Sequence, residues 1–215
     1  MTCVAVVDFG TGNLRSVCKA IEHVAPEVDV LVTDDPERIY SASHVVFPGQ
    51  GAIGTCVRAI KEKGLGDVLL EALDTKPFLG ICLGLQALYR ESEEHGGTSC
   101  LGVLGGEVKH LTHLNGVERW PTELKIPHMG WNTVRQTRPH PLWAGIASET
   151  RFYFVHSFCA VGDNDKEVFG TTNYGGLFTS AAGCGNLFAT QFHPEKSQHD
   201  GLILLKNFVH WDGSY

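Results

Sequence analysis

A short apolar run at Pro77–Ile81 breaks in the sequence Gly80-Ile81-Cys82-Leu83-Gly84, and a segment that favours a helix follows. A nucleophile elbow has this arrangement, in which a strand turns sharply at the nucleophile and a helix begins. The residues two before and two after the nucleophile must be small for the turn to close, and both are glycine. The start of the helix and the Leu83 amide would then favour a thiolate at Cys82 and an oxyanion beside it. A buried core cysteine is the alternative, and the motif alone leaves both interpretations open.

The first half of the chain alternates predicted strands with predicted helices. Apolar runs predict strands at 4–8, 28–32, 44–47 and 78–81, with helical patterns at 13–25 and from about 52 to 73. Asn13, after the turn Gly10-Thr11-Gly12, is a candidate N-cap. This alternation requires right-handed crossovers and a parallel sheet that is covered on both faces. The expected fold class is α/β, with an open, mostly parallel central sheet flanked by helices.

The C-terminal half is predicted to be rich in strands. Beyond Gly96, short β-branched and aromatic runs replace the helical patterns and predict strands at 107–111, 133–135, 152–157, 168–172, 177–181 and 187–191. A turn is expected at Tyr174-Gly175-Gly176, and a final helix at about 198–211 would return to cover the sheet. No segment has the composition of a linker, so residues 1–215 are expected to form a single domain.

Charge and composition exclude several classes of partner. The net charge is 17 − 24 = −7 and the basic residues are scattered, which argues against nucleic acid and anionic membrane as partners. The apolar run at the N-terminus meets Asp8 too early for a signal peptide or a membrane span, so we expect a cytoplasmic location. Seven cysteines without a Cys-x-x-Cys pair argue against disulfides and a structural zinc. No metal and no cofactor is expected.

A thiol nucleophile needs a base and a third group that orients the base. The segment Gln191-Phe192-His193-Pro194-Glu195 follows a predicted strand, so His193 should lie at a strand end, where open α/β sheets place their sites. Side chains two residues apart can lie on one side of an extended or tightly turned stretch, so Glu195 can fix the tautomer of His193. A lone histidine is more often structural, but the adjacent acid and the elbow together favour catalysis.

The loop Pro48–Gly51, after the third predicted strand, supplies backbone amides for an oxyanion hole. The amides of Gln50 and Gly51 would act there together with the amide of Leu83. The residues 49–54 also match G-x-G-x-x-G, the fingerprint of dinucleotide binding. We reject that interpretation on two grounds. The fingerprint belongs in the first βα turn of the sheet, and it needs an acid at the end of the next strand about 20 residues on. In this chain the segment at that distance is still predicted to be helical.

The elbow and the segment Phe192-His193-Pro194-Glu195 together resemble the class I (triad) glutamine amidotransferases, in the same order Cys, His, Glu. Further segments are similar to one branch of that family, the glutaminase subunits of imidazole glycerol phosphate synthases, and the resemblance covers essentially the whole chain. These segments are Asp8-Phe9-Gly10-Thr11-Gly12-Asn13-Leu14, Pro127-His128-Met129-Gly130-Trp131-Asn132, Tyr153-Phe154-Val155-His156-Ser157 and Glu195-Lys196-Ser197.

The resemblance implies hydrolysis of L-glutamine to L-glutamate and ammonia through a cysteinyl thioester. The ammonia would pass to a cyclase subunit of (βα)8 barrel fold, in a heterodimer that makes imidazole glycerol phosphate and AICAR from PRFAR in histidine biosynthesis. Cys82 would attack the amide carbon, His193 would protonate the departing ammonia and then activate water, and Glu195 would orient His193. The implied substrate-binding residues are Gln86, Gly49, Ser157 and Phe158, and the implied residues near the cyclase are Asn13, Trp131 and Lys196.

Other interpretations remain open from the residues alone. The chain could serve another synthase, such as those that make anthranilate, GMP or pyridoxal phosphate; it could be a cysteine hydrolase or esterase that works without a partner; or it could be a non-catalytic binding subunit. Four of the residues implied by resemblance also have a structural interpretation: Gln86 in helix packing, Asn13 as a cap, Trp131 in the core and Lys196 on the solvated surface. Because ammonia released without an acceptor is wasted, we expect low activity alone and a rise on binding the cyclase.

Overall fold

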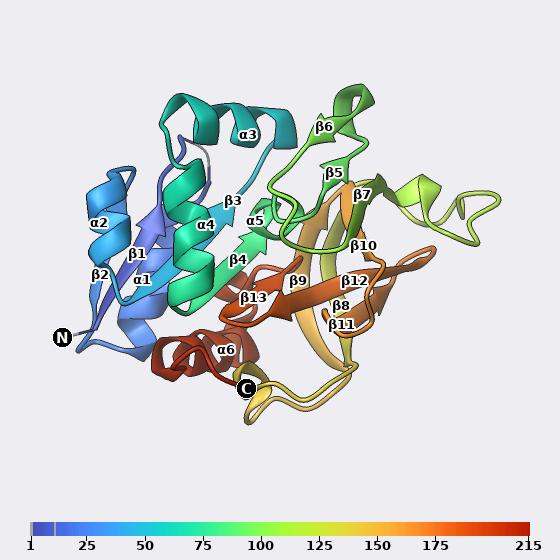
Figure 1. Cartoon of the computed structure of the whole chain (residues 1–215). Coiled ribbons are helices and arrows are strands. Elements are labelled where there is room, and N and C mark those ends of the chain that lie inside the picture. The colour runs from blue at the N-terminus through green and yellow to red at the C-terminus, as the bar shows by residue number, and fades with distance from the viewer. Residues whose placement is uncertain (1, 11) are drawn as a thin grey trace.

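The central layer of the molecule is a parallel sheet, as predicted. The computed structural model describes residues 2–10 and 12–215, so Thr11 of the predicted first turn lies outside the described residues. Parallel strands lie in the order β2 (Asp29–Thr33), β1 (Cys3–Val7), β3 (His44–Gly49), β4 (Phe78–Cys82) and β13 (Leu187–Thr190) (Figure 1). The carboxyl ends of β3, β4 and β13 therefore meet at one edge, where sheets of this kind bind their ligands.

Helices cover both faces of this layer. One face carries α1 (Leu14–Val24) and α6 (Gln198–His210), and the other carries α2 (Pro36–Ser41), α3 (Ile53–Glu62) and α4 (Gly66–Thr75) (Figure 1). Neighbouring residues of β3 point to opposite faces, as a strand requires. Val46 packs in the core under α1 and α6, whereas Val45 and Phe47 pack under the other three helices. The sheet thus separates two apolar cores.

Two helical features differ from the prediction. The single pattern predicted at about 52–73 is divided into α3 and α4, because Gly64 between them has a φ of +64°, which a right-handed helix cannot contain. The acidic segment before β3, for which no helix was predicted, forms α2. Asp35 caps this helix by accepting a hydrogen bond from the Glu37 amide at 3.0 Å. Asn13 stands at the N-cap of α1 as predicted, but its side chain makes no capping hydrogen bond.

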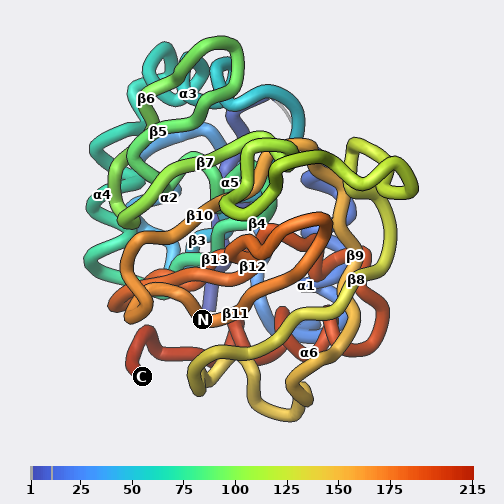
Figure 2. The backbone as a smooth tube through the Cα atoms, turned by 90° about the vertical axis from the view of Figure 1, so that its right-hand side faces the viewer, coloured from blue at the N-terminus to red at the C-terminus, as the bar shows by residue number. Residues whose placement is uncertain are grey.

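The second half extends the sheet with mostly antiparallel strands, which confirms the strand-rich prediction (Figure 2). Beyond β13 come β12 (Leu177–Cys184), β10 (Phe158–Gly162), β7 (Gly106–His110), β5 (Glu91–Ser92) and β6 (Thr98–Ser99), while β11 (Val168–Asn173), β8 (His128–Gln136) and β9 (Thr150–His156) branch from β12. The sequence did not predict β10, because only a bend at Ser157 separates it from β9.

Short helical turns complete the fold. They are α5 (Leu83–Gln86), η1 (Glu94–Gly96), η2 (Leu111–His113), η3 (Pro141–Trp143) and η4 (Pro194–Lys196). All seven cysteines are free thiols. Within residues 2–10 and 12–215, no helix has the length and apolar character needed to cross a membrane.

Candidate active site

Cys82 ends β4 in the sharp turn that the sequence predicts. Its backbone has φ of 55° and ψ of −103°, a strained conformation for a residue with a side chain. Glycine on either side leaves the space that the turn needs. A Cβ atom at Gly80 would lie 2.9 Å from the Ala189 Cβ, and one at Gly84 would overlap the carbonyl oxygen of Phe47. The elbow therefore requires both glycines.

The helix after the elbow, for which the sequence predicts no length, is short. α5 contains only four residues, so few peptide dipoles are aligned behind the Leu83 amide. The expected contribution of this helix to a thiolate at Cys82 stays a prediction.

Most of the predicted site residues meet in the wall of one cavity of about 730 Å³. The predicted residues in this wall are Gln50, Gly51, Cys82, Leu83, Gln86, Ser157, Phe158 and His193, and residues not predicted there are Gly10, Gly12, Glu94, Val155 and His156. Gly49 is not among the lining residues. Its α-carbon faces Leu83 so closely that a Cβ atom would lie 3.0 Å from the Leu83 Cβ, and its role as a substrate contact stays a prediction.

The predicted oxyanion loop is shorter than expected because β3 continues through Pro48 and Gly49. These residues pair in register with Ile81 and Cys82. Only Gln50 and Gly51 form the loop, and both are exposed and lie in the cavity wall with Cys82 and Leu83. The loop is thus held beside the nucleophile, which is the position that an oxyanion hole requires.

His193 and Glu195 form a buried pair at the end of β13. The Nδ1 atom of His193 lies 2.8 Å from Glu195 Oε1, and the two side chains are 5% and 2% exposed. Burial alone would lower the pKa of His193, but the neighbouring Cys82 and the Glu195 carboxylate more than compensate and raise it to about 10. The Nε2 atom of His193 has no hydrogen-bond partner among the described residues, and His193 lies in the cavity wall with Cys82. The three residues are therefore arranged as a nucleophile, a base and an orienting acid.

Gln86 is buried and joined to two groups that line or adjoin the cavity. Its Nε2 atom donates to the Phe158 carbonyl at 2.8 Å and to Gln191 Oε1 at 3.1 Å. Gln191 Nε2 in turn lies 3.6 Å from Cys82 Sγ. The sequence interpretation did not assign a function to Gln191, although it lies two residues before His193, a spacing that places both side chains on one side of an extended stretch.

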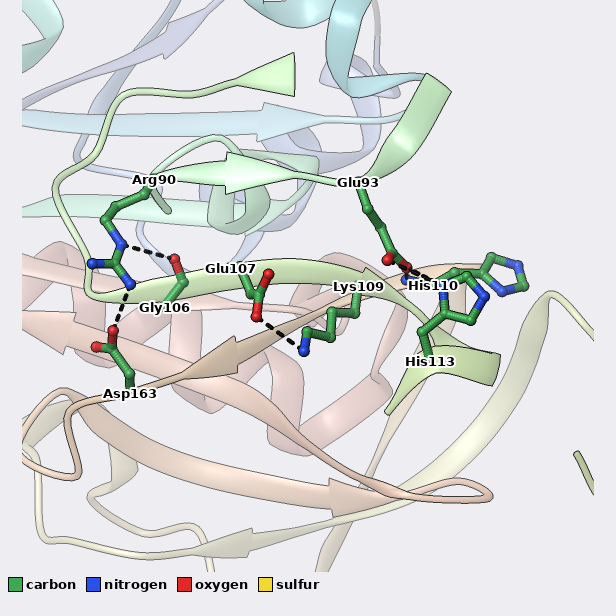
Figure 3. Close-up of polar contacts among 8 residues, drawn as sticks. All are labelled: Arg90, Glu93, Gly106, Glu107, Lys109, His110, His113 and Asp163. Atoms are coloured by element: carbon green, nitrogen blue, oxygen red, sulfur yellow. Dashed lines mark hydrogen bonds and ion pairs between the residues drawn. The ribbon is translucent and has the colours of Figure 1, made fainter. Parts of the chain in front are cut away.

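Glu94 is a second residue that the sequence interpretation missed. It is the carboxylate in the cavity wall, and its Oε2 accepts a hydrogen bond from the Ile53 amide at 2.8 Å. The preceding residue fixes this segment, because Glu93 accepts hydrogen bonds from the backbone of His110 and, at 3.0 Å, from His113 Nδ1 (Figure 3). No local pattern marks Glu94, which lies 12 residues after Cys82 in a short helical turn.

Two buried histidines, His156 in the cavity wall and its neighbour His128, are joined by a hydrogen bond. His156 Nδ1 donates to the Phe158 carbonyl at 2.9 Å, so its Nε2 is free to accept from His128 Nδ1, also at 2.9 Å. His128 Nε2 then accepts from Asn132 Nδ2 at 3.2 Å. Burial lowers the pKa of His156 to about 3 and that of His128 to about 4, so both rings are neutral at physiological pH. The Phe158 carbonyl is thus held by two donors, His156 and Gln86.

The residues predicted near a partner lie on the surface beside the site. Met129 and Trp131 on β8 are 63% and 37% exposed. The Trp131 ring contacts the Tyr153 ring with centroids 6.3 Å apart, and Lys196 Nζ lies 5.9 Å from the centroid of Tyr153. We call Met129, Trp131, Tyr153 and Lys196 the aromatic patch. Lys196 directly follows Glu195 in the sequence. Asn13 is exposed at the start of α1, a helix that contacts η4.

Comparison with known proteins identifies relatives of the whole chain. Residues 5–211 match the family described as Glutamine amidotransferase class-I. Imidazole glycerol phosphate synthase subunit HisH of Thiobacillus denitrificans is 53% identical over 209 residues, which cover 97% of this chain and 91% of that relative. The protein of the same name from Nitrosomonas europaea is also 53% identical, over 98% of this chain and 99% of its own length.

Solved structures agree on the fold. The structure of PurLQS from Thermotoga maritima matches with a TM-score of 0.73 at 18% identity, covering 97% of this chain and 98% of that chain. The structure of a putative GMP synthase component from Thermoplasma acidophilum matches with a TM-score of 0.69 at 19% identity, covering 98% and 93%. The overall fold is therefore shared by proteins of very different sequence.

Proposed function

Because the chain belongs to the class I glutamine amidotransferase family, we propose that it is the glutaminase subunit of an imidazole glycerol phosphate synthase. The observation that carries the proposal is the meeting of Cys82 and His193 in the wall of one cavity, with the buried Glu195 bonded to His193. The activity is hydrolysis of L-glutamine to L-glutamate and ammonia, which supplies nitrogen for histidine biosynthesis. Residues 5–211 match a single family, which supports one amidotransferase domain.

The chemistry follows from the three side chains. The Cys82 thiolate adds to the amide carbon of glutamine, and the charge moves to an oxyanion beside Leu83 and the loop at Gln50. His193 gives its Nε2 proton to the leaving nitrogen, the C–N bond breaks, and ammonia departs from a thioester. His193 then takes a proton from water, the hydroxyl group adds to the thioester carbon, and the C–S bond breaks to release glutamate. Glu195 keeps the Nδ1 proton of His193 in place throughout.

Complementary charges and donors in the cavity select glutamine. Gln86 uses its Nε2 on the Phe158 carbonyl and on Gln191, which leaves its Oε1 to accept from the α-ammonium group of the substrate. The Glu94 carboxylate supplies the opposite charge in the same wall. Backbone at Ser157 and Phe158 would complete the recognition of the amino-acid end.

The partner is a cyclase subunit, with which we propose a heterodimer. The aromatic patch is the proposed contact, because it exposes a tryptophan and a methionine, residue types that are enriched at protein interfaces. Asn13, at the start of a helix that contacts η4, would extend it. We place the complex in the cytoplasm, where a nucleophilic thiol stays reduced.

The proposal is tested by measuring glutamate release with and without a cyclase subunit that carries its nucleotide ligand. We expect a low rate for the isolated chain and a rise of roughly 10-fold or more with the liganded cyclase. Trp131→Ala should weaken capture of the cyclase, whereas Tyr40→Ala, which removes an exposed aromatic residue on α2, should leave capture unchanged. Equal rates with and without the cyclase, or activation by a different synthase instead, would reject the assignment.

Glu195→Gln should lower kcat by roughly 10²- to 10⁴-fold, because an amide in place of the acceptor favours the wrong tautomer of His193. The Glu195 carboxylate is one of the groups that raise the pKa of His193, so its loss lets the imidazolium lose its proton at lower pH. The alkaline limb of the pH profile of kcat/KM should therefore move to lower pH. A profile with the same alkaline limb as the parent protein would show that Glu195 does not act through His193.

A further inference from the structure

Gln191 is a buried polar side chain between the nucleophile and the residue proposed to hold the substrate. It has no exposed surface, and its backbone amide donates to the Ser180 carbonyl at 2.9 Å, which fixes the main chain. Its side chain reaches Gln86 at one end, with 3.1 Å between Oε1 and Gln86 Nε2, and Cys82 at the other, with 3.6 Å between Nε2 and Sγ. Burial of an amide is costly unless both ends have partners, and here the sulfur is one of them.

The hydrogen-bond network fixes which end of the amide faces the sulfur. The carbonyl oxygen of Phe158 can only accept, so the Gln86 atom 2.8 Å away from it must be the donor Nε2. The same Nε2 also faces Gln191, which must therefore present its Oε1 to Gln86. Consequently the NH₂ group of Gln191 points to Cys82 Sγ. His156 also donates to the Phe158 carbonyl and so helps to fix the position of that oxygen.

We propose that Gln191 is a further catalytic residue, whose side-chain N–H donates to the Cys82 sulfur whenever that sulfur carries negative charge. This proposal rests on the proposed function for its catalytic meaning. Charge lies on the sulfur before it attacks the amide carbon, and it returns when the C–S bond of the thioester breaks and the electron pair goes back to sulfur. A donor at both moments compensates for the short α5, which has few aligned dipoles to offer.

The other ionisable groups near the sulfur come from separate elements. His193 lies after β13, the neutral His156 ends β9, and Glu94 lies in η1, and all three share the cavity wall with Cys82. His193 and Glu94 are titratable, whereas the neutral His156 contributes no charge. Gln191 differs from all of them because its amide does not titrate, so its contribution is constant across the working pH range.

The test is the pH profile of alkylation of Cys82 by iodoacetamide, followed by mass spectrometry of the peptide that contains Cys82. Iodoacetamide is small and uncharged and needs neither glutamine nor the cyclase, so the result does not depend on the proposed function. In Gln191→Met the sulfur loses its donor, and we expect thiolate formation to become roughly tenfold less favourable. The midpoint of the alkylation profile should therefore move up by about one pH unit. Gln191→Glu, which keeps an oxygen toward Gln86 but places an acceptor at the sulfur, should move it further in the same direction.

Two further variants separate this effect from a general loss of packing. Gln86→Met removes the donor that orients the Gln191 amide, so it should raise the KM for glutamine and move the alkylation midpoint in the same direction as Gln191→Met but by less. Gln136, at the end of β8, donates a hydrogen bond to the Ile146 carbonyl. Gln136→Met should change neither the KM for glutamine nor the alkylation midpoint. In glutaminase assays with the cyclase, Gln191→Met should lower kcat roughly 10-fold and change KM less than about 3-fold. An unmoved midpoint in both Gln191 variants, or an equal shift in Gln136→Met, would overturn the proposal.

Discussion

Replacing Cys82 with alanine should reduce glutamate release from glutamine by roughly 10⁴-fold or more, even in the presence of the liganded cyclase. Without the sulfur no thioester can form. Among the described residues that line the cavity with His193, Cys82 is the one with a thiol. The measurement is glutamate production over hours at saturating glutamine, because the residual rate will be small. Binding of the cyclase to Cys82→Ala should be preserved, since the aromatic patch lies outside the cavity.

Cys184→Ser is the matched control for this variant. Cys184 is a half-buried thiol at the end of β12. It pairs with Leu187 at the start of β13, whereas His193 follows the end of β13. We expect it to retain full glutaminase activity. A Cys82→Ala protein with more than about a tenth of the parent rate would reject the nucleophile assignment, whereas ester hydrolysis by the parent chain alone would favour an independent hydrolase.

The sequence predicted the parts of the site that depend on local patterns. The elbow is such a pattern, because a strand that turns at Cys82 must have glycine two residues away on both sides. The His-Pro-Glu segment is another, since residues two apart after a strand can share one side. The parallel sheet followed in the same way from alternating apolar runs and helical periods. Each of these predictions uses residues that are neighbours in the chain.

The features that the sequence did not predict depend on distant parts of the chain. Glu94 belongs to the site only because Glu93 is held by His110 and His113 from another strand and turn. The short α5 could not be predicted, since the apolar residues after Leu83 suit a longer helix as well as the buried turn that forms. Gln191 is the exception: its spacing from His193 already placed the two side chains together, and that signal was available in the sequence.

Gly84→Ala should destabilise the protein by about 3 kcal/mol or more, because a Cβ atom at this position would overlap the Phe47 carbonyl oxygen. Neither side can move at low cost. Phe47 lies within β3, which pairs with β4 on one side and β1 on the other, and Gly84 lies within the turn that fixes Cys82. For a chain of this size, the loss corresponds to a fall in Tm of about 6–12 °C. Any protein that remains folded should also have little glutaminase activity, since the displaced turn carries the nucleophile and the Leu83 amide.

Gly66→Ala is the control that isolates the steric effect from the simple gain of a methyl group. Gly66 begins α4, its φ is not positive, and no atom lies within 4 Å of the position of an added Cβ. Alanine should therefore be neutral or stabilise the protein by up to about 1 kcal/mol, since glycine is the more costly residue to order in a helix. Thermal and urea unfolding of the two variants and the parent measure the difference. Equal Tm values for Gly84→Ala and Gly66→Ala would mean that β3 and the elbow can move apart, and the strained turn at Cys82 would then not depend on close contact between Gly84 and Phe47.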